Sequence, residues 1–315
     1  MSQPGAPDLS VQVGALRLCN PILAASGTFG YGVEFAHLVD LNQLGGIVVK
    51  GLSAQPLEGA PAPRLCPTAG GMLNAVGLQN VGVRAFVAEK LPALRQFRTA
   101  IVANVFGHSV EEYVEVIRVL EDAEGLAAYE LNISCPNVKK GGVQYGTDPS
   151  MTSEVVAAAR SAARRPLWVK LSPNVTDIRV VARAAAESGA DALTVANTYP
   201  GMSVDISTRR SRLGNLTGGL SGPAIKPITL RLVHEAVSAA KVPVIGLGGI
   251  EVVADVVEFI VVGATAVQVG TAHFVDPRAS EGLVGGLEKW CSDNKVQNIN
   301  NLRGTLEKEN AGPNC

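Results

Sequence analysis

Charged and aromatic side chains are scarce in this chain of 315 residues, at 17% and 4% of the sequence. The net charge is only −1, and no basic patch stands out, so the sequence gives no electrostatic case for binding nucleic acid or an anionic membrane. Hydrophobic residues still make up 47%, so alanine, valine, leucine and glycine must do the packing. Small aliphatic residues of this kind favour helices that lie close against a parallel sheet.

The cysteines and the apolar runs exclude further classes. The five cysteines are scattered and form no CxxC pair, which argues against a disulfide framework, a zinc site or an iron–sulfur cluster in this chain; they are Cys19, Cys66, Cys135, Cys291 and Cys315. The longest apolar region, 256–269, is too short to span a bilayer, and the polar segment 1–9 resembles no signal or transit peptide. We therefore expect a soluble protein of the reducing cytoplasm, without a metal site.

Short aliphatic runs alternate with stretches that have helical spacing. The eight runs span 21–25, 46–49, 100–103, 127–131, 166–169, 192–196, 242–245 and 266–269. Helical patterns occupy 110–120, 154–163, 178–189, 230–240 and 252–262. Eight strand–helix units predict a parallel (β/α)8 TIM barrel rather than an open sheet.

The spacing of the units predicts how the rest of the chain is arranged. Segments 53–79 and 198–222 are long connections on the face where barrels build their sites. Residues 11–18 alternate around a glycine and predict a hairpin that closes the bottom of the barrel. We expect one domain over 1–315, with its core at about 11–291 and a polar, poorly ordered tail over 292–315.

The predicted strands end in residues suited to ligand binding. In a barrel these residues share one pocket; they are Ser26-Gly27, Lys50-Gly51, Asn104, Asn132 with Cys135, Lys170, Asn197-Thr198, Gly248-Gly249 and Gly270-Thr271. Lys50 and Lys170 each end a strongly apolar strand. Such a lysine either reaches solvent or meets an anion, and two of them in one barrel mouth favour the anion.

Two glycine-containing loops indicate the nature of that anion. Residues 246–250 and Gly270-Thr271 follow the last two strands, where barrels often bind phosphate with bare backbone amides. Glu251 stands where a dinucleotide fingerprint would have its third glycine, so the pattern favours a mononucleotide-like phosphate. Tight turns that need glycine only for their backbone geometry are the alternative.

Two further segments have both a functional and a structural interpretation. In Asn132-Ile133-Ser134-Cys135-Pro136-Asn137, the proline keeps the thiol on a turn, where it suits proton or acyl chemistry; a buried, inert cysteine is the alternative. Segment 74–80 (NAVGLQN) could bring backbone amides to a carboxylate, with Asn74 reading a ring amide. It could equally be a hairpin followed by a helix cap.

Taken together, these motifs resemble class 1 dihydroorotate dehydrogenase. The likeness runs from about residue 11 to 277 and rests on six ordered motifs: ASGTFG (25–30), NAVGLQN (74–80), NISCPN (132–137), Asn197-Thr198, TGGLSGPA (217–224) and GGI (248–250). Class 2 members carry serine in place of Cys135 and an N-terminal helical extension. Segments 138–142 and 201–220 are more similar to the NAD-linked subclass, 1B, than to the fumarate-linked 1A.

The resemblance implies a noncovalent FMN and the oxidation of dihydroorotate to orotate in pyrimidine synthesis. It implies that Cys135 is the general base at C5 and that Lys170 stabilises reduced flavin. The implied substrate contacts are Lys50, Asn74, Gly77, Leu78, Asn132, Asn137, Asn197 and Thr198. The implied FMN contacts are Ser26, Lys50, Gly51, Asn104, Asn132, Lys170, Ala196, Gly222, Gly248, Gly249, Gly270 and Thr271. Ala196 departs from the isoleucine or valine usual in the family.

The resemblance also implies partners. FAD and a [2Fe-2S] cluster would belong to a second, electron-transfer subunit, in a heterotetramer built on a homodimer of this chain. Three alternatives stay open. They are the fumarate-linked 1A subclass, a barrel dehydrogenase that attacks purine mononucleotides with Cys135, and a catalytically silent barrel that binds flavin or a nucleotide.

Overall fold

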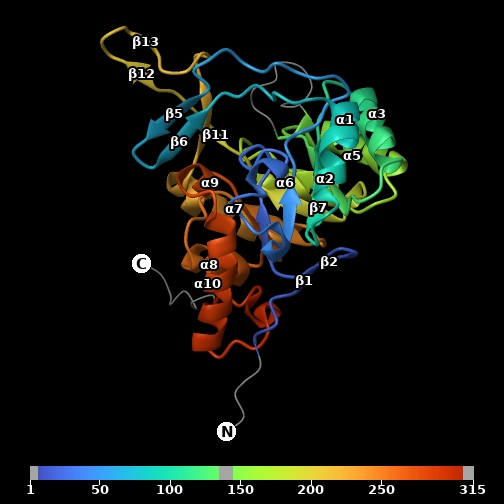
Figure 1. Ribbon diagram of the computed structural model, residues 1–315, viewed down its shortest axis with the longest axis vertical. Helices are drawn as coiled ribbons and strands as arrows, with labels where there is room; N and C mark the ends of the chain where they lie inside the picture. The colour runs from blue at the N-terminus through green and yellow to red at the C-terminus, as the bar shows by residue number, and fades with distance from the viewer. Residues whose placement is uncertain (1–5, 135–144, 308–315) are drawn as a thin grey trace.

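A closed barrel of eight parallel strands forms the centre of the computed structural model, which describes residues 6–134 and 145–307 (Figure 1). The strands are β3 (Ile22–Ala24), β4 (Gly46–Val48), β7 (Ala100–Val105), β8 (Ala128–Asn132), β9 (Leu167–Lys170), β10 (Ala192–Val195), β15 (Val244–Leu247) and β16 (Ala266–Val269). They close in the order β10-β15-β16-β3-β4-β7-β8-β9. Each strand overlaps one of the predicted runs, so the predicted barrel is confirmed.

Helices surround the barrel, and several of them begin at a residue whose side chain caps the first backbone amides. The α-helices and one π-helix are α1 (Val83–Ala85), η3 (Phe86–Lys90), α2 (Leu91–Leu94), α3 (Val110–Glu121), α5 (Pro149–Ala162), α6 (Ile178–Glu187), α7 (Lys226–Ala239), α8 (Val253–Val261), α9 (Ala272–Val275) and α10 (Ala279–Asp293). The 3₁₀ turns are η1 (Val33–Phe35), η2 (Leu41–Gln43), η4 (Pro223–Ile225) and η5 (Ile299–Leu302). The Ser109 side chain accepts a hydrogen bond from the Glu112 amide, and Asp177 accepts one from that of Arg179. Within the described residues, no helix is both long and apolar enough to cross a bilayer.

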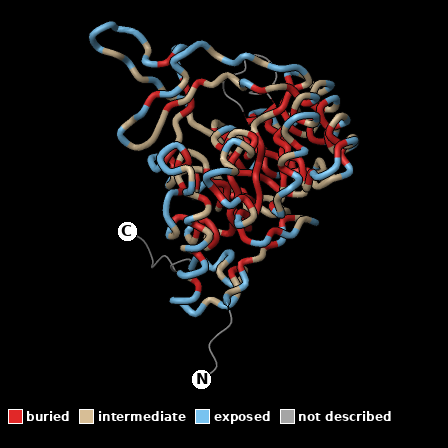
Figure 2. Tube along the Cα trace, viewed as in Figure 1, coloured by how far each residue is buried: buried red, intermediate tan, exposed pale blue. Residues whose placement is uncertain are grey.

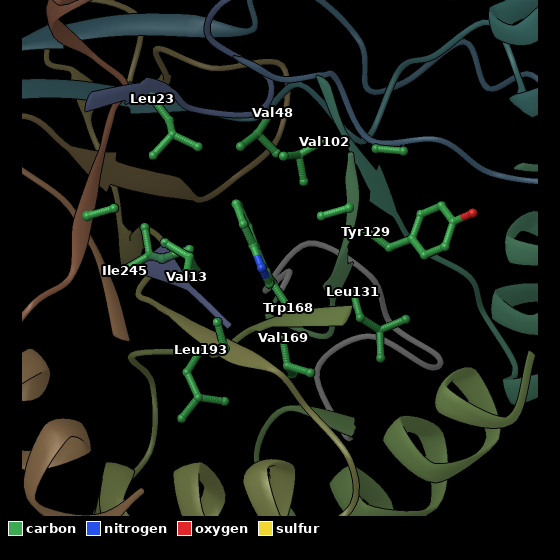
Figure 3. Close-up of a cluster of buried hydrophobic side chains, with 14 of the residues drawn as sticks. Val13, Leu23, Val48, Val102, Tyr129, Leu131, Trp168, Val169, Leu193 and Ile245 are labelled. Carbon is green, nitrogen blue, oxygen red and sulfur yellow. The ribbon is translucent and has the colours of Figure 1, made fainter. Parts of the chain in front are cut away.

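The core lies inside the barrel and between the barrel and its helices (Figure 2). Trp168 is fully buried, and it points into the barrel among Val48, Val102 and Ile245 (Figure 3). Its bulk fills space that aliphatic residues alone would leave open, since the strands carry mainly valine, leucine and alanine.

A hairpin closes the amino-terminal end of the barrel, as the sequence predicts. Strands β1 (Val11–Val13) and β2 (Leu16–Leu18) pair in antiparallel register, and Val13 is fully buried. Gly14 turns between them with φ +61°, and a Cβ built there would lie 3.2 Å from the Asp191 carbonyl oxygen. Asp191 directly precedes β10, so the hairpin packs against the amino end of that strand.

The two long connections form an additional sheet that the sequence does not reveal. Its order is β11 (Tyr199–Gly201), β14 (Gly218–Ser221), β6 (Gly71–Asn74) and β5 (Leu65–Thr68), all antiparallel. The small hairpin of β12 (Val204–Asp205) and β13 (Arg210–Ser211) projects beyond this sheet (Figure 1). The predicted extended loops therefore exist, and they are joined to one another by strand pairing.

The tail differs from the expectation of poor order. After α10, residues up to 307 pack on the barrel, with Ile299 fully buried and a strand bridge between Asp8 and Asn298. Ile299 joins the main hydrophobic core, and the partly buried Val296 and Leu302 pack against that core, so these apolar residues anchor the segment. Residues 308–315 lie outside the described part of the chain.

Candidate active site

A cavity opens at the carboxyl ends of the barrel strands and encloses about 1270 Å³, part of it open to solvent. The sequence-predicted residues that line it are Ser26, Lys50, Gly51, Asn74, Gly77, Leu78, Asn104, Asn132, Lys170, Asn197, Thr198, Gly222, Gly248, Gly249, Gly270 and Thr271. Ala196 is fully buried and does not line the cavity. Cys135 and Asn137 lie outside the described residues.

Both predicted lysines reach this cavity. Lys170 is only 4% exposed; its Nζ donates to Ser26 Oγ at 3.2 Å and lies 3.9 Å from Glu130 Oε1. Lys50 is partly buried, and this burial, reinforced by the positive charge of Arg64, lowers the pKa of its ammonium. An anionic ligand would offset both effects, so the pocket favours negative charge.

Asparagine side chains form the polar floor. Asn132 Nδ2 donates to Asn104 Oδ1 at 3.4 Å, and Asn197 Nδ2 donates to Ser134 Oγ at 2.7 Å. Ser134 Oγ in turn donates to Asn132 Oδ1 at 2.8 Å. Residues from three different strand ends are thereby joined, as expected where parallel strands end at one rim.

Beneath this floor lies a residue that the sequence analysis does not single out. Glu130 is fully buried in the barrel, and its Oε1 accepts a hydrogen bond from Asn104 Nδ2 at 2.7 Å. Its Oε2 accepts from Thr194 Oγ1 at 2.8 Å and from Gln268 Nε2 at 2.5 Å. The sequence does contain a signal for this residue, because Glu130 is an acidic residue inside the apolar run 127–131. A glutamate in such a strand indicates a buried partner, since glutamate is almost never fully buried unless paired.

Several glycines also line the cavity. Gly248 and Gly249 have φ of +143° and +75°, and a Cβ built on Gly270 would meet nothing closer than 3.7 Å. Packing therefore does not require glycine at 270, and the bare backbone leaves room for a ligand. Thr271 Oγ1 donates to Ser221 Oγ at 2.8 Å, so the two hydroxyls face the same place. This donor set, with Lys170 nearby, fits the phosphate and ring system of a flavin mononucleotide.

Segment 74–80 lines the cavity and is held in an unusual conformation. Leu78 has φ +57°, a left-handed value that is strained for a residue with a Cβ. Gly77 has φ +72°, and a Cβ there would lie 2.4 Å from the Ala60 backbone nitrogen. Asn74 ends β6, and its Nδ2 donates to the Gly219 carbonyl at 3.1 Å. The segment therefore follows a hairpin and also forms part of the pocket.

The chain matches known dihydroorotate dehydrogenases in sequence. The family model described as "Dihydroorotate dehydrogenase" matches residues 8–290. A "Putative dihydroorotate dehydrogenase A (fumarate)" from Solibacter usitatus is 57% identical over 96% of this chain and 99% of its own length. A "Dihydroorotate dehydrogenase B (NAD(+)), catalytic subunit" from Trichlorobacter lovleyi is 54% identical over the same shares of both chains.

A solved structure supports the architecture alone. The dihydroorotate dehydrogenase of Eimeria tenella, solved with ferulenol, superposes with a TM-score of 0.79 at 22% identity, over 97% of this chain and 90% of that one. The matched family model and the relatives go further, because they cover nearly the whole chain at high identity. The chain belongs to the dihydroorotate dehydrogenase family.

Proposed function

We propose that this protein oxidises dihydroorotate to orotate with FMN bound in the barrel mouth, as a step of pyrimidine synthesis. The observation that carries the proposal is that the strand ends bring two lysines, four asparagines and the glycine loops to one and the same cavity. Family membership supplies the substrate, since the relatives are named for it. We also propose that residues 1–315 form one domain.

The glycine loops and the buried lysine form the proposed flavin half of the site. Gly248, Gly249 and Gly270 would present backbone amides to the phosphate. Lys170 would stabilise negative charge on the ring system, because an ammonium only 4% exposed acts through little screening water. When bound, FMN supplies the oxidising group that takes a hydride from C6 of the substrate.

The other half of the cavity would hold the substrate. Lys50 and the backbone at Gly77 and Leu78 would bind the carboxylate, and the asparagine amides would read the ring carbonyl and N–H groups. In this arrangement the ring would lie over one face of the proposed flavin site. Thr198 and Asn137 complete the proposed contacts, with Asn137 outside the described residues.

Cys135 is the proposed general base, on the strength of the NISCPN motif; it too lies outside the described residues. Its thiolate would remove the C5 proton. Because the reference pKa of cysteine is about 8.5, most of the thiol is protonated at neutral pH unless the site lowers that value. Turnover should therefore rise with pH above neutrality.

The electron acceptor is the finer part of the proposal. Relatives carry both fumarate-linked and NAD-linked names, and several of the latter are called catalytic subunits. We propose that NAD is the final acceptor, reached through a partner subunit with FAD and a [2Fe-2S] cluster, and that the chain forms the homodimer core of a heterotetramer. Rapid turnover of the lone chain with fumarate would favour the 1A alternative, and NAD reduction by the lone chain would contradict the partner.

Anaerobic mixing of the purified yellow protein with dihydroorotate tests the central step. The flavin absorbance should bleach in the parent and in Cys19→Ala, which changes an exposed cysteine. Cys135→Ala should keep its flavin and bleach at least about a hundredfold more slowly, the usual scale for a lost general base. Equal rates would remove Cys135 from the mechanism, and no bleaching in the parent would leave a silent binding barrel. A preparation without flavin absorbance would favour the purine-mononucleotide alternative.

A further inference from the structure

The hydrogen bonds of the pocket floor all run in one direction. From Thr198 to the barrel interior, each donor points to the next residue inward, and no link is reversed. The chain consists of Thr198 N–H to Asn197 Oδ1 (2.8 Å), Asn197 Nδ2 to Ser134 Oγ (2.7 Å), Ser134 Oγ to Asn132 Oδ1 (2.8 Å), Asn132 Nδ2 to Asn104 Oδ1 (3.4 Å) and Asn104 Nδ2 to Glu130 Oε1 (2.7 Å).

The chain ends on a group that receives only donors. Besides Asn104, the Glu130 carboxyl accepts from Thr194 Oγ1 and Gln268 Nε2, and the Lys170 ammonium lies 3.9 Å away. Donors on both oxygens and a cation beside one of them are the surroundings of a carboxylate, which can accept and cannot donate. Such a group forces its neighbour Asn104 to turn the amide nitrogen inward.

An amide can be rotated by half a turn with little change of shape, so its direction must be fixed by partners. With Nδ2 of Asn104 committed to Glu130, its Oδ1 is left to accept from Asn132. The Oδ1 of Asn132 then accepts from both the hydroxyl and the backbone N–H of Ser134. The acceptor atom of Asn132 is thereby used within the protein, and one amide N–H remains for a ligand.

We propose that Glu130 is a positioning residue that fixes the orientation of the Asn104 and Asn132 amides and so makes the pocket floor a donor surface. Such a surface selects ligands that present carbonyl oxygens and rejects those that present N–H groups at the same place. The ligand part of this inference rests on the proposed function, because orotate and flavin both carry ring carbonyls. The orientation itself rests on the hydrogen bonds alone.

Three substitutions separate the roles of the carboxylate. Glu130→Gln keeps an acceptor for Asn104, because its new N–H group can be received by the Thr194 hydroxyl or by Gln268 Oε1, which has no hydrogen-bond partner in the described part of the chain. Glu130→Met removes both oxygens, and Glu130→Asp withdraws them by one methylene. Glu121→Met is the matched control. Glu121 is a second acid whose side chain is only 7% exposed; it has several donors, among them Arg164 and Tyr129, and it does not line the cavity.

The first readout is the ratio of dissociation constants for an amino analogue and for orotate, measured by the perturbation of flavin absorbance. Two analogues of orotate are compared, one with an amino group in place of the carbonyl at C2 and one with an amino group in place of the carbonyl at C4. The analogue that binds the parent protein more weakly is used for the ratio. The parent, Glu130→Gln and Glu121→Met should disfavour the analogue by about tenfold to a hundredfold, since a donor would face a donor. In Glu130→Met and Glu130→Asp the freed amides can turn, and the ratio should fall to within about threefold of one.

The second readout does not depend on orotate. Titration of the apoprotein with FMN should show about tenfold weaker binding in Glu130→Met and Glu130→Asp, with parental affinity in Glu130→Gln and Glu121→Met. The proposal would be overturned if either Glu130→Asp or Glu130→Met kept both the parent's ratio of dissociation constants and the parent's affinity for FMN. Because either variant can give this result, the proposal can still be tested if one of the two fails to fold. If the parent binds FMN and is not reduced by dihydroorotate, the proposed function fails, while the FMN titration still decides the role of Glu130.

Discussion

Acid should lower the free energy of unfolding of this protein because of one buried histidine. His273 in α9 is 3% exposed, its Nε2 lies 2.9 Å from Ser280 Oγ, and its Nδ1 has no hydrogen-bond partner among the described residues. Burial lowers the pKa of this imidazole from 6.5 to about 4, against smaller opposing contributions from the Gly270 backbone and from Asp276. The folded protein therefore holds His273 neutral at a pH where the unfolded chain already binds a proton.

The sign and size of the effect follow from this difference. Because the unfolded state binds more protons between pH 6.5 and 4, stability falls as the pH falls through that window and levels off below it. A shift from 6.5 to about 4 corresponds to a full loss of roughly 3 kcal/mol, at about 1.4 kcal/mol per unit. At pH 5 about 2 kcal/mol of this would already be lost.

Urea unfolding at pH 8 and pH 5 measures the effect, with His273→Gln as the reference. Glutamine retains a nitrogen and an oxygen near Ser280 and does not titrate, while every other acidic and basic group is unchanged. The stability lost between the two pH values should be greater in the parent by about 2 kcal/mol. Equal losses in the two proteins would refute the burial argument. Because α9 follows Gly270-Thr271 directly, FMN should also be released at a higher pH in the parent than in the variant.

Four further substitutions test the packing. In Gly219→Ala the new Cβ would stand 2.0 Å from Thr198 Oγ1, so Thr198 must move. We therefore expect orotate to bind about tenfold more weakly in an equilibrium titration. An unchanged affinity for orotate would contradict the close approach of Gly219 and Thr198. Gly282→Ala and Gly285→Ala lie in α10, where an added Cβ meets nothing within 4 Å, and each should raise stability in urea by about 0.5–1 kcal/mol, a loss being the contrary result. Trp168→Ala should destabilise the barrel by about 3–5 kcal/mol in the same assay, and a cost below about 1 kcal/mol would mean that Trp168 does not fill the barrel.

The barrel could be predicted because its signal is local. Strands buried on both faces read as short aliphatic runs, and helices such as α3 and α6 show apolar spacing and a capping residue. The additional sheet could not be predicted in this way. Its strands are three or four residues long and rich in glycine, and the pairing of Asn74 with Gly219 joins segments far apart in the chain. The burial of Ile299 likewise depends on core residues that lie far from it in the sequence.

The sequence by itself determined the strand ends, and with them the lysines, asparagines and glycines that the closed barrel gathers into one cavity. A residue at the carboxyl end of a parallel strand must reach the common rim, so its place follows from its position in the chain. It also determined the family, through motifs of fixed order. The role of Glu130 was decided only by the tertiary structure. The sequence does not indicate which residues pair with Glu130 in its apolar strand. Closure of the barrel brings Asn104, Thr194 and Gln268 to it from three other strands. Those contacts set the direction of the hydrogen bonds, and direction is a property of the assembled site that no list of residues contains.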